Sequence, residues 1–259
     1  MSRPWLRGYA LLVYAFLYLP IFVMVAFSFN SDPRNAIWQG FSLQWYGKLF
    51  HNIPLLKAFR NSLEVAALST LISTSIGTAA ALALHRYRFT GRALVSSLAL
   101  LPMMVPEIVM GISLLTFFVR LGVQLSFWTI VVAHVAFSVG YVTLTVQARM
   151  AGGNVHLEEA AADLGADAWT TFWLVTLPRI LPGVVSGALL AFTLSFDDFV
   201  ITFFTAGVGC GTLPLTIYSM LKFGVTPEIN AVSTLMLSFT LLLMLIWSRL
   251  EEKSDEAIR

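Results

Sequence analysis

Long apolar runs, separated by short polar connections, dominate the pattern of hydrophobic and polar positions along this chain of 259 residues. Each run has about 20 residues or more, which is enough to cross the hydrocarbon core of a bilayer. The apolar residues are continuous rather than alternating, which predicts membrane helices and not the strands of a closed barrel. We therefore expect an all-α membrane protein with one transmembrane domain over residues 1–259. Its six predicted helices cover residues 9–29, 62–84, 94–119, 127–147, 181–205 and 229–248.

The third run differs from the others because it contains Pro102, Pro106 and Glu107. Proline removes a helical hydrogen bond, and at membrane depth the freed backbone groups need partners in protein or in a water-filled cavity. The pattern predicts a kinked or locally opened helix that faces the protein interior or a cavity.

The composition agrees with a membrane protein. Apolar residues make up 58% of the chain and charged residues only 12%, whereas a soluble domain has about 25% charged residues. A large soluble core is excluded because the apolar residues are segregated into membrane-length runs. The net charge of +2 comes without a basic block, so no nucleic-acid partner is expected. Cys210 is the only cysteine, which excludes an intramolecular disulfide and a cysteine metal cluster.

The N-terminal run could imitate a cleavable signal peptide, since Arg3 and Arg7 precede it and small residues lie near its end at residues 26–28. The run from Tyr9 to Phe29 is longer than the 7–15 residues of a typical signal-peptide core. We therefore expect a retained first span.

The basic residues in the short connections predict the orientation of the chain in the membrane. With six spans, one side carries the N-terminal arginines, the connection between spans two and three, the end of span four and the C-terminal segment. These residues are Arg3, Arg7, Arg86, Arg88, Arg92, Arg149, Arg249 and Lys253. Basic residues mark the cytoplasmic side, so both termini are expected in the cytoplasm, together with the loop at 148–180.

This cytoplasmic loop cannot enter lipid because it carries several carboxylates. They are Glu158, Glu159, Asp163 and Asp167. Asn154 can cap a first helix and Gly165 can end it. Asp167 can cap a second helix, which Pro178 limits or kinks. On these residues alone, an ordinary amphipathic connector remains an alternative to a docking surface for a partner.

The spacing in the loop carries a resemblance. Glu159-Ala160-Ala161 is followed after three residues by Gly165, and then by Val175 and Leu177-Pro178. This order resembles the "EAA" signature of ABC importer permeases, with Val in place of Ile. The resemblance implies a type I ABC importer permease fold and a coupling helix that docks on an ATPase subunit. Its contact residues would be Glu159, Ala160, Ala161, Leu164 and Gly165.

The same resemblance implies partners. The chain has no G-x-x-x-x-G-K-[ST] loop, and the glycines at 207–211 are interpreted as a turn in an outer loop. We expect a transport subunit that is not itself an enzyme and binds no cofactor, with ATP and Mg²⁺ held by two cytoplasmic ATP-binding subunits. A second permease subunit and a periplasmic binding protein complete the expected assembly.

Carboxylates at membrane depth are the candidates for solute contact. Asp197 and Asp198 fall inside the fifth predicted span, and Glu107 in the third. Ionisable groups there normally face a bundle interior or water, although a role in helix capping or interhelical hydrogen bonding is the alternative. Adjacent helical positions point about 100° apart, so the two aspartates are expected to have different roles. His134, in span four, is interpreted as a hydrogen-bonded packing residue. Carboxylates with aromatic neighbours suit an organic cation, and also a hard metal ion.

Four blocks resemble the permeases of polyamine (spermidine/putrescine) importers of the PotC/PotI type. They are "SFNS…WQGFSLQWYGKL", "PEIVMGISLL", "TLSFDDFVITFF" and "LPLTIYSMLKFGVTPEINA", and the likeness extends from residue 14 to about 245. The resemblance implies alternating access for a polyamine delivered by a periplasmic polyamine-binding protein. It adds Glu228 to the three carboxylates as a candidate for the substrate path. Trp45 and Tyr46, in an outer loop suited to the membrane interface, are further candidates.

Other functions remain as alternatives. Within the same family the cargo could be another small solute, such as a metal ion, a thiamine-like cation or an amino acid. An ion-coupled secondary transporter or a channel would not need the helix–Gly–helix loop, and it often has inverted repeats. An intramembrane enzyme would need a catalytic constellation, and the spans contain no convincing catalytic motif and no complete metal ligand set.

Overall fold

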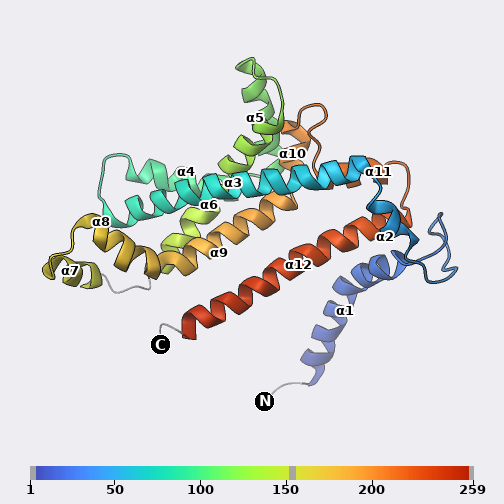
Figure 1. Cartoon of the computed structure of the whole chain (residues 1–259), viewed down its shortest axis with the longest axis horizontal. Helices are drawn as coiled ribbons and strands as arrows, with labels where there is room; N and C mark the ends of the chain where they lie inside the picture. Colours follow the sequence, from blue (N-terminus) through green and yellow to red (C-terminus); the bar gives the residue numbers. More distant parts are fainter. Residues whose placement is uncertain (1–3, 152–155, 257–259) are drawn as a thin grey trace. The chain divides into compact units, whose positions relative to one another are not determined.

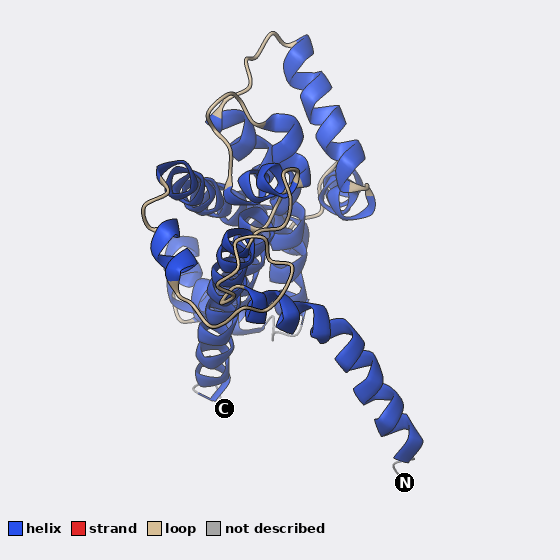
Figure 2. Cartoon of the chain, turned by 90° about the vertical axis from the view of Figure 1, so that its right-hand side faces the viewer, coloured by secondary structure: helices blue, strands red, loops and turns tan. Residues whose placement is uncertain are grey.

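The computed structural model describes residues 4–151 and 156–256, which form helices joined by loops (Figure 2). These described residues contain no strand, and Asn30 and Phe41 form an isolated β-bridge. Figure 1 shows the helices in chain order. They are α1 (Pro4–Phe27), α2 (Gln44–Leu49), α3 (Ile53–Arg86), α4 (Arg92–Met104), α5 (Glu107–Arg120), α6 (Phe127–Ala151), α7 (His156–Asp163), α8 (Ala168–Thr171), the π turn η1 (Phe172–Thr176), α9 (Leu177–Phe196), α10 (Val200–Thr205), α11 (Leu213–Leu221) and α12 (Pro227–Glu256).

Five helical segments in the described part of the chain are long and apolar enough to cross a membrane. They are Trp5–Phe27, Ile53–Arg86, Phe127–Ala151, Ala168–Phe196 and Pro227–Leu245. The helices α4 and α5 together make a sixth span when this bent pair is counted as one. The all-α prediction is confirmed. The second helix begins nine residues earlier than the predicted 62, because the polar residues at its start still form helical turns outside the apolar run.

The bend between α4 and α5 measures 115°. Pro102 lies inside α4, whereas Val105 and Pro106 both have extended backbones (ψ of 131° and 135°). A residue that precedes proline is pushed towards extended conformations by the ring, so Pro106 ends α4 at Met104. Pro106 therefore accounts for the opened helix that the sequence predicts.

Within the predicted single domain, the chain forms two compact units. The first combines Met1–Lys57 with Thr216–Leu243, and the second combines Ala58–Leu215 with Met244–Arg259. In the first unit the loop after α1 folds around the buried Asn30. The Asn30 amide donates to the Ile37 carbonyl at 2.9 Å, and the Asn30 carbonyl accepts from the Trp45 indole N–H at 2.7 Å.

In the second unit α6 packs against α4 and α9. Val142 and Val146 of α6 lie in a buried cluster with Ile180 of α9. At Gly140, α4 comes so close that an added Cβ would overlap the carbonyl oxygen of Ala99. A glycine is required at this crossing because the obstacle is backbone and cannot rotate away.

Candidate functional site

A cavity of about 300 Å³ lies in the second unit, where two broken helical segments meet. Its lining comes from the start of α5, from α6, and from the end of α9 with the segment that follows it. The lining residues are Glu107, Phe137, Thr193, Leu194, Asp197, Asp198, Phe199 and Val200. Three of these residues are acidic, two are aromatic and none is basic. The cavity therefore has the charge and the aromatic surface that suit a positively charged organic solute.

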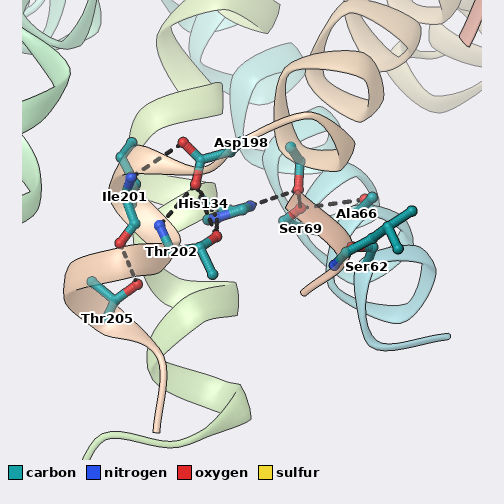
Figure 3. Close-up of polar contacts among 10 residues, drawn as sticks. Ser62, Ala66, Ser69, His134, Asp198, Ile201, Thr202 and Thr205 are labelled. Atoms are coloured by element: carbon teal, nitrogen blue, oxygen red, sulfur yellow. Dashed lines mark hydrogen bonds and ion pairs between the residues drawn. The ribbon is translucent and has the colours of Figure 1, made fainter. Parts of the chain in front are cut away.

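The predicted fifth span, at 181–205, is wrong in two respects, because it is interrupted after Phe196 and its helical segment begins well before residue 181. Helix α9 ends at Phe196, and α10 begins only at Val200. The physical reason lies in Asp198, whose carboxylate accepts hydrogen bonds from the backbone N–H groups of Ile201 and Thr202 (Figure 3). A side chain that binds free N–H groups in this way starts a new helix.

The other end of this span differs because α8, the π turn and α9 form one continuous segment, from Ala168 to Phe196. Pro178 was expected to limit or kink the second helix of the loop, but it lies in the first turn of α9 and the helix continues through it. The π turn Phe172–Thr176 immediately precedes this proline. Wider i→i+5 hydrogen bonding changes which carbonyl groups need a donor there, so a residue without an N–H is accommodated.

The Asp198 carboxylate contacts partners on α10 and on α6. Its Oδ2 accepts from the Thr202 hydroxyl and the Thr202 N–H, both at 2.8 Å, and lies 3.2 Å from Nε2 of His134 (Figure 3). The side chain is 6% exposed. Buried polar groups in proteins are normally hydrogen-bonded, and these contacts supply hydrogen bonds to the carboxylate.

His134 extends this network across three further contacts. Its Nδ1 lies 2.7 Å from the Ser195 hydroxyl, which lies 2.9 Å from the Ser69 hydroxyl, and its Nε2 lies 3.0 Å from the Thr202 hydroxyl. The ring is 1% exposed. The network joins α3, α6, α9 and α10, and so fixes the break between α9 and α10. No spacing pattern in the sequence predicts this network, because its members lie on four separate segments.

Asp197 and Glu107 have more solvent access than Asp198. Both are exposed residues that line the cavity, and Glu107 is the first residue of α5, directly after the proline break. The structure thus brings together the three carboxylates that were predicted to lie at membrane depth. Asp198 is nearly buried and hydrogen-bonded within the protein, and Asp197 and Glu107 are at exposed positions of the cavity lining.

The remaining substrate-path candidates belong to the first unit. Glu228, in the first turn of α12, accepts a hydrogen bond from the Asn52 amide at 3.0 Å. Tyr46 shares a 2.7 Å hydrogen bond with Ser28. The ring of Trp45 is 6% exposed, and its indole N–H is bonded to the Asn30 carbonyl. The hydrogen bond from the indole N–H stabilises Trp45 in its buried position.

The loop at 148–180, within its described part, forms the helix–Gly–helix elbow. Helix α7 is followed by Gly165, with φ of +86°, and the Ala166 N–H bonds back to the Ala161 carbonyl at 3.0 Å. Such a left-handed glycine closes a helix at its C-terminus. Asp167 then caps α8 by accepting from the Thr170 N–H, and the hydrogen bonds from Thr170 hold the pKa of Asp167 below its ordinary value. The predicted cap Asn154 lies outside the described residues.

The predicted coupling residues gather on the solvent-facing side of this elbow. Glu159 and Ala160 are exposed, Ala161 is half-buried, and Leu164 is 90% exposed. A large apolar side chain with that exposure, beside small residues, fits a surface that a partner protein covers.

A polar contact ties α7 to the membrane helices. Arg86, at the end of α3, donates to Glu158 at 2.7 Å and to the Thr176 hydroxyl at 2.7 Å, and that hydroxyl lies 2.8 Å from Glu158. Partial burial raises the pKa of Glu158, but the hydrogen bonds from Arg86 and Thr176 and the charges of Arg86 and Arg179 outweigh it and lower that pKa. From the sequence, Arg86 was informative only about orientation. The available signal was the opposite charges of two connections predicted to lie on the same side of the membrane.

Comparisons with known proteins agree with this architecture. Residues 73–259 match the family described as "Binding-protein-dependent transport system inner membrane component". The spermidine/putrescine transport system permease protein PotC of Haemophilus influenzae is 43% identical over 256 residues, with 98% of this chain and 100% of that protein covered. The putrescine transport system permease protein PotI of Escherichia coli is 40% identical over 245 residues, with 92% of this chain and 87% of that protein covered.

Solved structures show the same fold at low sequence identity. A chain of the bacterial ABC transporter involved in alginate import aligns over 96% of both chains, with a TM-score of 0.72 and 16% identity. A chain of the MetNI methionine ABC transporter covers 77% of this chain and 95% of its own length, with a TM-score of 0.64 and 20% identity. The chain therefore belongs to the inner membrane components of binding-protein-dependent transport systems, with the type I ABC importer permease fold.

Proposed function

We propose that this chain is the permease subunit of an ATP-driven importer that carries a polyamine, putrescine or spermidine, inward across the inner membrane by alternating access. The cargo is supported by the relatives named as spermidine/putrescine and putrescine permeases, at 43% and 40% identity. The fold, the apolar helices and the family support the transport role.

The acidic cavity is the observation that carries the choice of cargo. Amines on alkyl chains are protonated at neutral pH, as the lysine side chain is. Glu107 and Asp197 can pair with such ammonium groups, and the rings of Phe137 and Phe199 line the same space. A volume of about 300 Å³ lies at the lower end of the range for small-molecule sites.

In this mechanism Asp198 positions the backbone of α10 and does not bind the cargo. It holds the break between α9 and α10, and the break places Asp197 at the cavity. Weak binding by few carboxylates suits transport, since a site that held a dication tightly would retain it. Glu228, Trp45 and Tyr46 are retained as candidate contacts for the cargo.

The helix–Gly–helix elbow formed by α7, Gly165 and α8 is the basis for the proposed partner subunits. Glu159, Ala160, Ala161, Leu164 and Gly165 form the surface that docks on one of two cytoplasmic ATP-binding subunits. ATP and Mg²⁺ bind there and not on this chain. A second permease subunit completes the pore, and a periplasmic polyamine-binding protein delivers the cargo. Both termini lie in the cytoplasm.

The test is uptake of labelled putrescine and spermidine into cells that lack their own polyamine importers and express this chain with its partner subunits. We expect ATP-dependent uptake that Glu159→Lys abolishes. Asp197→Asn and Glu107→Gln should each raise the KM about ten-fold, which corresponds to the loss of about 1.4 kcal/mol of binding. Glu64→Gln is the matched control, because Glu64 is an exposed carboxylate paired with Arg60 on α3.

Absence of uptake of both polyamines, with the complex assembled, would contradict the proposed cargo. The alternative is then another small solute, such as a metal ion, a thiamine-like cation or an amino acid. Unchanged KM in both carboxylate variants would remove the cavity from the substrate path.

A further inference from the structure

Arg86, Glu158 and Thr176 lie on three segments that meet at the cytoplasmic end of the second unit. We propose that these residues, here called the Arg86 link, transmit the movement of α7 to α3 and to the start of α9. The proposal rests on the proposed role of α7 as the helix that docks on the ATPase subunit. It adds the contact through which that docking reaches the membrane helices.

The geometry of the link is a closed triangle. One guanidinium nitrogen, Nη2 of Arg86, reaches both Oε1 of Glu158 and Oγ1 of Thr176, and these two oxygens are 2.8 Å apart. Each member therefore contacts the other two. A shift of any one segment changes its hydrogen bonds to both of the other segments. Charge-assisted hydrogen bonds of this length are the stronger kind.

Burial differs around the triangle in a way that suits a moving joint. Thr176 is fully buried, whereas the side chains of Arg86 and Glu158 are 28% and 25% exposed. The buried member is anchored in the helix that continues into the membrane. The two charged members remain in reach of water, which lowers the cost of separating and re-forming their contact.

The π turn gives Thr176 its orientation. Thr176 is the last residue of η1, and the N–H of Leu177 bonds to the carbonyl of Phe172. One additional residue in a turn rotates the preceding side chains by about 100° relative to the helix that follows. The π turn thus allows the aromatic residues of 169–173 and the hydroxyl of Thr176 to serve different faces of one continuous segment.

The experiment compares single and double charge exchange. In the assembled transporter, Arg86→Glu and Glu158→Arg should each lower cargo uptake per ATP hydrolysed by about five-fold or more, in the range of typical coupling between sites. The ATPase subunits should still co-purify with both variants. The double variant Arg86→Glu/Glu158→Arg should recover most of the ratio, because the pair is restored with its charges exchanged.

The matched control is the Arg60–Glu64 pair of the same helix, which is exposed and formed between residues four apart. Arg60→Glu should leave uptake per ATP unchanged. Thr176→Val keeps the shape of the side chain and removes only the hydroxyl. This variant tests the Arg86 link even if the charge-reversal variants do not accumulate in the membrane. We expect it to lower the same ratio.

Two results would overturn the proposal. One is a normal ratio of uptake to hydrolysis in both single variants and in Thr176→Val. The other is a double variant no better than the worse single variant, which would mean that the two charges act separately. A wild-type complex that hydrolyses ATP without moving either polyamine would instead contradict the proposed cargo. The ratio is then measured with the cargo of its binding protein.

Discussion

Asp197 and Asp198 are adjacent in the chain but occupy different environments. Asp198 is surrounded by donors from α10 and by the ring of His134. Asp197 is an exposed residue at the cavity. Both residues line the cavity, but the helix ends at this point, so that the Asp198 carboxylate bonds to the backbone of α10 whereas Asp197 lies at an exposed position.

Replacing Asp198 by alanine should destabilise the protein rather than only slow transport. The substitution leaves the N–H groups of α10 and the buried His134 ring without this partner, and each buried group left unsatisfied costs about 1–3 kcal/mol. The measurement is the free energy of unfolding of the detergent-solubilised chain. Glu64→Ala, which breaks an exposed pair, should change this free energy by less than about 1 kcal/mol. Equal effects of the two variants would contradict the role given to Asp198.

The lowered pKa of Glu158 predicts a dependence of stability on pH. A carboxyl group whose pKa is lower in the folded state adds stability above its ordinary pKa, here 4.5, and this contribution is lost as the pH falls through the folded-state value. Wild type should therefore unfold at a higher temperature than Glu158→Gln at pH 6–7. The difference should shrink below pH 4.5. A difference that is constant from neutral to acidic pH would mean that the charge of Glu158 is not what stabilises the contact.

At the scale of elements, Gly165 determines the geometry of the elbow. Its φ of +86° disfavours side chains, yet an added Cβ would meet open space. Asparagine tolerates the left-handed region better than alanine does. We therefore expect Gly165→Ala to reduce ATP-dependent uptake more than Gly165→Asn. The opposite order would show that close approach of a partner, and not the backbone conformation, requires glycine here.

The crossing of α4 and α6 is a second element-scale prediction. Gly140→Ala should lower the free energy of unfolding by about 1–3 kcal/mol, the usual cost of overpacking, because the added methyl group meets a backbone carbonyl. Gly8→Ala in α1 is the control, since nothing lies within 4 Å of its added Cβ. Thermal unfolding of both variants in the same detergent measures the difference.

At the scale of the whole molecule, the long apolar runs and the elbow could be predicted from sequence because their signals are local. Hydrophobic length predicts spans, and Gly165 and Asp167 have positional preferences at helix ends. The break after Phe196 could not be predicted, because two aspartates in an otherwise apolar run do not by themselves indicate that one of them starts a new helix. It depends on Asp198, His134 and Thr202, which meet only in the folded chain.

The orientation of the molecule is open to a labelling experiment, because Cys210 is its only cysteine. With both termini in the cytoplasm, Cys210 faces the periplasm. A membrane-impermeant maleimide should therefore label it in spheroplasts. In the Cys210→Ser background, Thr90→Cys in the connection between α3 and α4 should be labelled only in inside-out vesicles. The reverse pattern would invert the topology.

The break after Phe196 also has an electrostatic consequence. The peptide dipoles of α9 add up along its length, so its C-terminal end carries a partial negative charge, and its last turn lines the cavity through Thr193 and Leu194. The N-terminal end of α5, which carries a partial positive charge, also meets the cavity, and the carboxylate of Glu107 at this end offsets that charge. The proposed preference of the cavity for a positively charged solute is therefore partly a property of the backbone. Neutralising Asp197 alone should weaken this preference without converting the path into one for anions.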